Sequence, residues 1–148
     1  MPTRKAYASS VLTFVVTIFL LGLLILTLAP SADRNRTVEW MPFEQLGQGG
    51  WSRAAVVAEM LGNVILFIPV GLLAPARWQA TRSLGRVILA GAAFSLLIET
   101  LQFALNLGRQ PSVTDIIMNT SGAALGWLLF LLLRRKMDRL HIPGDMPS

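Results

Sequence analysis

Four long apolar stretches constrain this chain more than any other feature of its sequence. The first, Ser9 to Ala29, has 21 residues and no charged side chain. Three more, at 54–76, 87–107 and 113–133, have similar lengths and carry one acidic residue each. A helix needs about 20 predominantly apolar residues to cross the hydrocarbon core of a bilayer. The pattern therefore predicts an all-α integral membrane bundle of four transmembrane helices.

The composition agrees with a membrane protein and excludes several other classes. The 148 residues are 53% hydrophobic and 14% charged, which departs from the average soluble domain. A soluble four-helix bundle would carry a polar stripe on each helix, and residues 20–28 have none. The chain has no cysteine, so disulfide and thiol chemistry are excluded. Its length and lack of internal repeats indicate a single domain over 1–148.

The distribution of basic residues predicts the orientation of the chain in the membrane. Lys and Arg near the ends of spans favour the cytoplasmic side. With both termini in the cytoplasm, nine of the 13 Lys and Arg residues lie inside and four outside. This sidedness accounts for the net charge of +5, so we expect no nucleic-acid partner. The alternative is a cleaved signal peptide in place of the first span, but its apolar core is too long for that pattern.

Two features of the spans bear on helix packing. Pro69 removes a helical hydrogen bond that neighbouring helices can replace within a membrane, so we expect a kink in the second span. Gly122 and Gly126, four residues apart, allow close approach of another helix. We expect them to serve packing within the bundle first and a homo-oligomer contact second. Ser112 and Asp115 resemble a capping box at the start of the fourth span.

Six polar side chains inside these apolar spans point to a shared site. Each of the last three spans carries two of them, three or four residues apart, which places both on one helix face. They are Glu59 and Asn63, Glu99 and Gln102, and Asp115 and Asn119. At about 1.5 Å per residue, all six lie in the outer half of the bundle. A carboxylate deep in a span costs on the order of 3 kcal/mol, so we expect these faces to turn inward, with Arg109 at the rim.

This convergence predicts a polar pocket that is open to the outside. The alternative is a network that only joins the helices, in which each contact contributes about 1 kcal/mol. We favour a functional site, because ionisable groups within membranes are functional by default. Three acids without a nearby histidine make a poor transition-metal site, so we expect no metal and no cofactor.

The same residues resemble the VanZ-like family of small bacterial membrane proteins. The match runs through N-V-I-L-F-I-P-V-G (63–71), I-E-T-L-Q (98–102) and R-Q-P-S-V-T-D-I-I-M-N-T-S-G-A-A-L-G (109–126), within a motif-bearing core at 54–133. The family's motif positions fall on Asn63, Phe67, Pro69, Gly71, Glu99, Gln102, Arg109, Asp115, Asn119 and Gly122. Glu59 lies outside this motif.

The resemblance implies a protein of the bacterial cytoplasmic membrane, in a family whose namesake is linked to resistance to the glycopeptide teicoplanin. We favour binding of an amphiphilic or anionic envelope ligand, in which Arg109 meets an anionic headgroup. Membrane lipids and a lipid-linked envelope precursor are the expected partners. One alternative is an intramembrane enzyme acting on a lipid-linked or glycopeptide substrate, with Glu99 and Asp115 as acid and base. The other is a proton or solute pathway, and whether the protein is an enzyme stays open.

Overall fold

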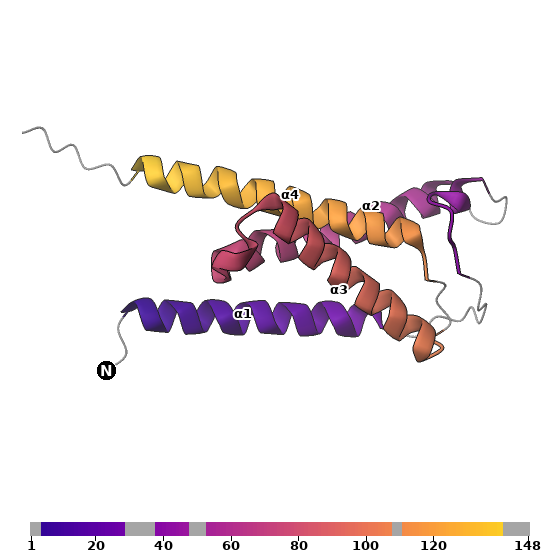
Figure 1. Cartoon of the computed structure of the whole chain (residues 1–148), viewed down its shortest axis with the longest axis horizontal. Coiled ribbons are helices and arrows are strands. Elements are labelled where there is room, and N and C mark those ends of the chain that lie inside the picture. Colours follow the sequence, from indigo (N-terminus) through magenta and orange to yellow (C-terminus); the bar gives the residue numbers. More distant parts are fainter. Residues whose placement is uncertain (1–3, 29–37, 48–52, 108–110, 141–148) are drawn as a thin grey trace, which may run out of the picture.

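The computed structural model describes residues 4–28, 38–47, 53–107 and 111–140 of the chain (Figure 1). Within these residues the regular elements are α-helices and two short 3-10 turns. They are α1 (Arg4–Thr27), η1 (Glu44–Leu46), α2 (Arg53–Arg77), η2 (Gln79–Thr81), α3 (Leu84–Ala104) and α4 (Val113–Leu140). Each of the four α-helices is long and apolar enough to cross a membrane. The predicted all-α bundle of four transmembrane helices is confirmed, and the chain is a multi-pass membrane protein.

The helix ends differ from the predicted spans most at the end of α4 and at the start of α1, which begins five residues before Ser9. The helix α3 ends at Ala104, three residues before the predicted end. The helix α4 continues to Leu140, seven residues beyond its predicted end. Its 28 residues rise about 42 Å, whereas the hydrocarbon core is only about 30 Å thick. The last turns of α4 therefore extend into or beyond the headgroup layer.

Contacts between the helices show that their directions alternate. The Gln102 side chain near the end of α3 donates a hydrogen bond to the last carbonyl of α1, at Thr27. Arg77, at the end of α2, reaches Thr13 in the first half of α1. Thus α1 and α3 run one way and α2 the other. The start of α1 and the end of α4 lie at the same end of the bundle (Figure 1).

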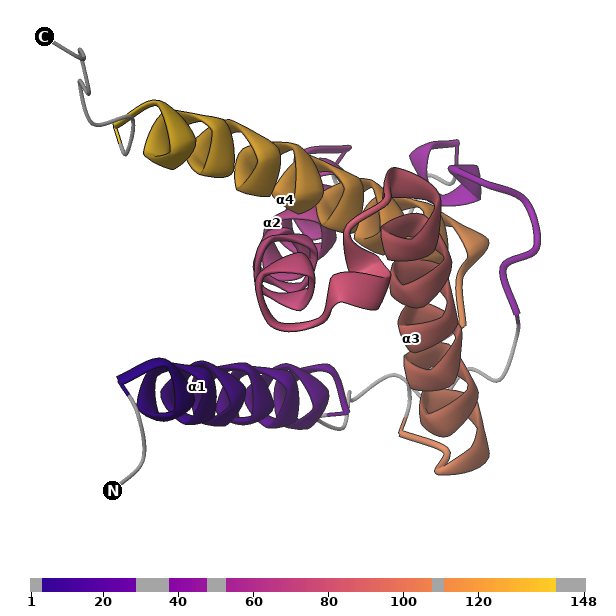
Figure 2. The same cartoon turned by 60° about the vertical axis from the view of Figure 1, so that its left-hand side comes forward.

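The two ends of the bundle differ in the chemistry of their side chains. The polar end is where α1 and α3 finish and α4 begins, and it carries Asn63, Glu99, Gln102, Asp115 and Asn119. The basic end is where α2 and α4 finish, and it carries Arg77, Arg82, Arg86, Arg134, Arg135, Lys136 and Arg139. α3 crosses the bundle obliquely, and α1 lies apart from α4 (Figure 2).

The most extensive helix contact joins α2 to α4, and small residues make it possible. A Cβ atom added at three glycines would overlap backbone oxygens of the facing helix: Gly71 would meet Ala123, Gly122 would meet Val64, and Gly126 would meet Ile68. The spacing of Gly122 and Gly126 thus serves packing inside one chain, as expected. A homo-oligomer through the same two glycines stays a prediction, and it would have to displace α2.

The apolar core lies between α1, α2 and α3. Leu23, Phe67 and Ile98 are almost fully buried there, one from each helix. The Phe67 ring packs against Phe94, with ring centroids 5.9 Å apart. The helix α2 continues without interruption through Pro69, and the expected kink stays a prediction.

Candidate polar site at the start of α4

Glu99 caps the N-terminus of α4 from a neighbouring helix. Its side chain is 4% exposed, and its Oε2 accepts a hydrogen bond from the backbone N–H of Ser112 at 3.1 Å. The first N–H groups of a helix lack intrahelical partners and carry the positive end of the helix dipole. A carboxylate at this position therefore gains both a hydrogen bond and a favourable field. This contact explains how an acid is accommodated near the end of α3.

The predicted capping box at Ser112 and Asp115 is wrong. The hydroxyl of Ser112 is buried and makes no hydrogen bond in the described part of the chain. Other segments cap the helix instead: Glu99 does so through its carboxylate, and Glu39 does so through its carbonyl, which accepts from the Val113 N–H at 3.1 Å. The Glu39 N–H also donates to the Pro111 carbonyl at 2.9 Å, so these two segments pair over one parallel bridge.

Asn63 and Asp115 join α2 to α4. The amide Nδ2 of Asn63 donates to Oδ1 of Asp115 at 2.6 Å. Both residues are half-buried, so they lie at the rim of the polar end. This pair joins the polar faces of the second and fourth spans, which the sequence analysis expected to turn inward.

Exchanging the two groups of this pair tests its contribution. Asn63→Asp would place two carboxylates in contact, and we expect it to lower the free energy of unfolding by about 1–2 kcal/mol, the scale of a charge-assisted hydrogen bond. Adding Asp115→Asn should restore most of the loss, because an amide again faces a carboxylate. Thermal unfolding of the detergent-solubilised variants measures both effects. A double variant that is no more stable than Asn63→Asp would show that the pair contributes little.

Two further predicted residues make buried contacts between helices. Asn119 is 5% exposed, and its Nδ2 donates to Ser95 Oγ of α3 at 2.9 Å. Gln102 is 4% exposed, and its Nε2 donates to the Thr27 carbonyl at 2.7 Å. That carbonyl is one of the groups left without a partner at the end of α1. The two amides therefore attach α3 to α4 and to α1.

Two predicted residues do not take part in these contacts. The side chain of Glu59 is exposed, so the expectation that it turns inward with Asn63 does not hold. Glu59 lies about 9 Å from the start of α2, near the polar surface where a carboxylate is tolerated. Arg109 lies outside the described residues, and its place at the rim stays a prediction.

The structure also brings buried polar residues to this end that the sequence analysis did not single out. Glu39 is 8% exposed and Thr114 is 2% exposed. The Thr114 hydroxyl accepts the backbone N–H of Phe43 at 2.8 Å, and Phe43 has a positive φ of 63°, which is uncommon for a bulky residue. Segment 38–47 thus lies against the start of α4. No periodic signal in the sequence predicts this, because the segment is a loop.

The polar end combines deeply buried side chains with a more accessible rim. Its three deepest predicted residues are at most 5% exposed, whereas the rim residues Asn63 and Asp115 are partly accessible. Within the described ranges, no three His, Cys, Asp or Glu side chains are grouped so as to hold a metal ion. The groups available are carboxylates, amides and hydroxyls, which bind hydroxyl and amine groups through hydrogen bonds.

Two comparisons of the chain with known proteins gave a match. A family model described as VanZ/LLP1 matches residues 12–134. Protein VanZ of Enterococcus faecium is 36% identical to the chain over 81 residues, which are 55% of this chain and 49% of that protein. The aligned region thus spans about half the length of that relative. No solved structure matches the chain.

Proposed function

We propose, because the chain belongs to the VanZ/LLP1 family, that this envelope membrane protein binds the headgroup of an amphiphilic envelope ligand at its polar end. In this proposal the polar end faces outward, both termini are cytoplasmic, and the membrane is the bacterial cytoplasmic membrane. The excess of Lys and Arg at the basic end supports that orientation.

Three buried oxygen atoms without partners carry the proposal. Ser112 Oγ, Asn119 Oδ1 and Thr120 Oγ1 make no hydrogen bond in the described part of the structure. A buried polar group without a partner costs about 1–3 kcal/mol. A network that only joined helices would be expected to satisfy its own atoms. These oxygens, at Ser112 just before α4 and in its first two turns, favour a site that completes its hydrogen bonds with a ligand.

The chemistry of the site indicates the class of ligand. Carboxylate and amide oxygens accept hydrogen bonds from hydroxyl and amine groups, which suits a sugar-like headgroup. Arg109, three residues before Ser112 in sequence, would meet a phosphate or carboxylate. Trp40 and Met41, 77% and 70% exposed, project from segment 38–47, where aromatic side chains favour the headgroup layer. We infer a lipid-linked precursor that carries an anionic group and a hydroxyl-rich headgroup.

In this proposal the ligand displaces segment 38–47 from the start of α4. This segment is joined to the start of α4 by the backbone hydrogen bonds of Glu39 with Pro111 and Val113 and by the bond from the Phe43 N–H to the Thr114 hydroxyl. The Ser112 hydroxyl, one of the three buried oxygens, belongs to the residue between the two that Glu39 contacts. The segment therefore acts as a cover over the start of α4 in this proposal.

Mass spectrometry of co-purified molecules tests the proposal. Protein purified in a mild detergent should retain a lipid-linked glycan, and Arg109→Gln should reduce that retention by about tenfold, the scale of one charge-assisted contact. The variant should still insert and fold, as judged by its yield and elution in gel filtration. Arg53→Gln is the matched control, because Arg53 is also basic and begins α2 at the same side. Equal retention in all three proteins would refute the proposal, as would an equal loss in both variants.

A further inference from the structure

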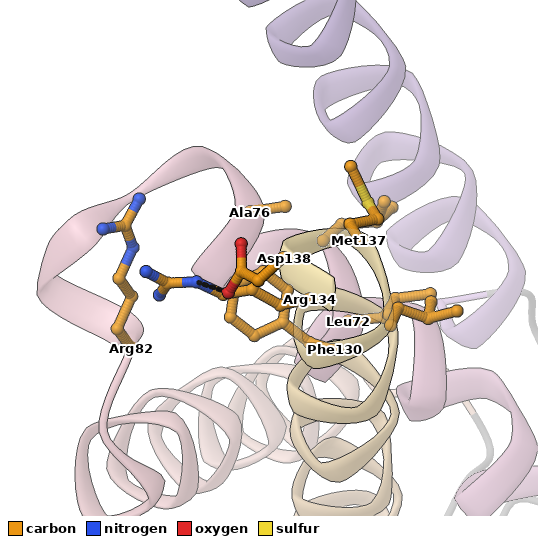
Figure 3. A pocket seen from close by; sticks show the side chains of 9 residues that line it. Leu72, Ala76, Arg82, Phe130, Arg134, Met137 and Asp138 are labelled. Carbon is orange, nitrogen blue, oxygen red and sulfur yellow. Dashed lines mark ion pairs between the residues drawn. The ribbon is translucent and has the colours of Figure 1, made fainter. Parts of the chain in front are cut away.

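A second site lies at the basic end of the bundle, about 29 Å along α4 from Asp115 to Arg134. A cavity of about 440 Å³ opens there between the second half of α2 and the last turns of α4 (Figure 3). We propose that this cavity binds an anionic phospholipid, with its phosphate between Arg82 and Arg134 and an acyl chain along the apolar wall. This inference goes beyond the proposed function and does not depend on it.

The walls of the cavity match the two parts of a phospholipid. Leu72, Phe130 and Met137 form an apolar face, while Arg82 and Arg134 lie at its polar side (Figure 3). The two arginines come from different elements, since Arg82 follows η2 and Arg134 belongs to α4. Guanidinium groups suit phosphate oxygens because their planar array of donors can bind two oxygens at once. Headgroup and acyl chain are therefore recognised by separate faces of one cavity.

The backbone of Arg82 is held in position before any lipid binds. The indole Nε1 of Trp127 on α4 donates to the Arg82 carbonyl at 2.9 Å. The Arg82 N–H donates to the Gln79 carbonyl at 3.2 Å. These bonds attach the connection between α2 and α3 to α4. Less conformational entropy is lost on binding when the backbone that carries a recognising side chain is already placed.

The depth of the cavity agrees with a lipid that lies in the bilayer. Leu72 and Phe130 belong to helix segments that cross the membrane. Arg134 lies in the last turns of α4, which extend beyond the hydrocarbon core. Trp78, 41% exposed at the same end, is a residue type that favours the interface. An acyl chain and a phosphate would therefore meet the matching walls without leaving the membrane.

The charge at this end favours an anionic headgroup over a zwitterionic one. The end of α2, the connection to α3, the start of α3 and the last turns of α4 carry seven Lys and Arg residues and one acid, Asp138. Asp138 contacts Arg134 at 3.9 Å, and both side chains are more than half exposed. Exposed pairs of this kind contribute little. A phosphate can therefore replace Asp138 as the partner of Arg134.

Lipid selectivity measured on the whole protein tests this site. The protein is reconstituted in vesicles of equal parts phosphatidylglycerol and phosphatidylcholine, extracted in mild detergent, and analysed by native mass spectrometry. We expect the wild type to retain phosphatidylglycerol preferentially. The double variant Arg82→Gln and Arg134→Gln should lose that preference by about tenfold or more, since each arginine near the membrane surface contributes about fivefold.

Two further variants separate this site from general attraction by basic residues. The double variant Arg135→Gln and Lys136→Gln removes the same charge from the same end of the bundle, outside the cavity lining. It should reduce the preference clearly less than the cavity variant does, because it leaves both arginines of the cavity in place. Asp138→Asn should increase the preference, because it removes the carboxylate that competes for Arg134.

Three outcomes would overturn the inference. They are no lipid preference in the wild type, an equal loss in the two double variants, and displacement of the lipid by an equal concentration of glycerol phosphate. The last result would indicate a site for a free anion rather than for a lipid.

Discussion

Gly126→Ala is expected to prevent the native contact between α2 and α4. The new methyl group would overlap the Ile68 carbonyl oxygen and lie 2.8 Å from the Leu72 backbone nitrogen. Both are backbone atoms, so no side-chain rotation can relieve the overlap. Overpacking of a well-packed interior typically costs about 1–3 kcal/mol. We expect the upper end of this range or more, because the helices would have to separate.

The test compares the melting temperature and the folded yield of detergent-solubilised variants. Gly62→Ala is a matched control, since nothing lies within 4 Å of the Cβ that it adds to α2. It should be neutral or more stable by about 0.5–1 kcal/mol, because glycine is unfavourable inside a helix. Gly71→Ala should resemble Gly126→Ala, since its Cβ would overlap the Ala123 carbonyl. Equal melting temperatures for Gly126→Ala and Gly62→Ala would contradict the close backbone contact.

Glu99→Leu is expected to destabilise the start of α4. The Ser112 N–H would lose its acceptor, and Ser112 is only 2% exposed, so water cannot easily replace the carboxylate. The negative charge at the helix N-terminus would also be lost. We expect the free energy of unfolding to fall by about 2–3 kcal/mol, the scale for a buried donor that loses a charged partner.

Two variants control for the loss of an acid in a membrane span. Glu59→Leu also removes a carboxylate, but this side chain is exposed and makes no hydrogen bond among the described residues, so we expect little change. Glu99→Gln keeps an oxygen acceptor and should retain most of the stability. Thermal unfolding compares the three proteins. A Glu99→Leu variant as stable as Glu59→Leu would show that capping by Glu99 contributes little.

The contacts at the polar end show why helix periodicity predicted the site only in part. Spacings of three and four residues correctly grouped Asn63, Asp115, Gln102 and Asn119 near one end. They could not identify partners such as Ser95 and the Thr27 carbonyl, because those lie on other helices at positions set by packing. Glu59 shares a helix face with Asn63 in sequence, yet it is one turn closer to the surface, where the helices leave it exposed.

The sequence by itself determined that the chain crosses the membrane four times and where its polar and basic residues lie along each crossing. Backbone groups without hydrogen-bond partners are unfavourable in hydrocarbon. A long apolar segment in a membrane is therefore stable as an α-helix, which pairs its own backbone groups. The partners of those residues depend on the tertiary structure. Glu39 and Glu99 cap α4, and Gly126 packs against Ile68, because loop and helix positions far apart in sequence come together only when the bundle assembles.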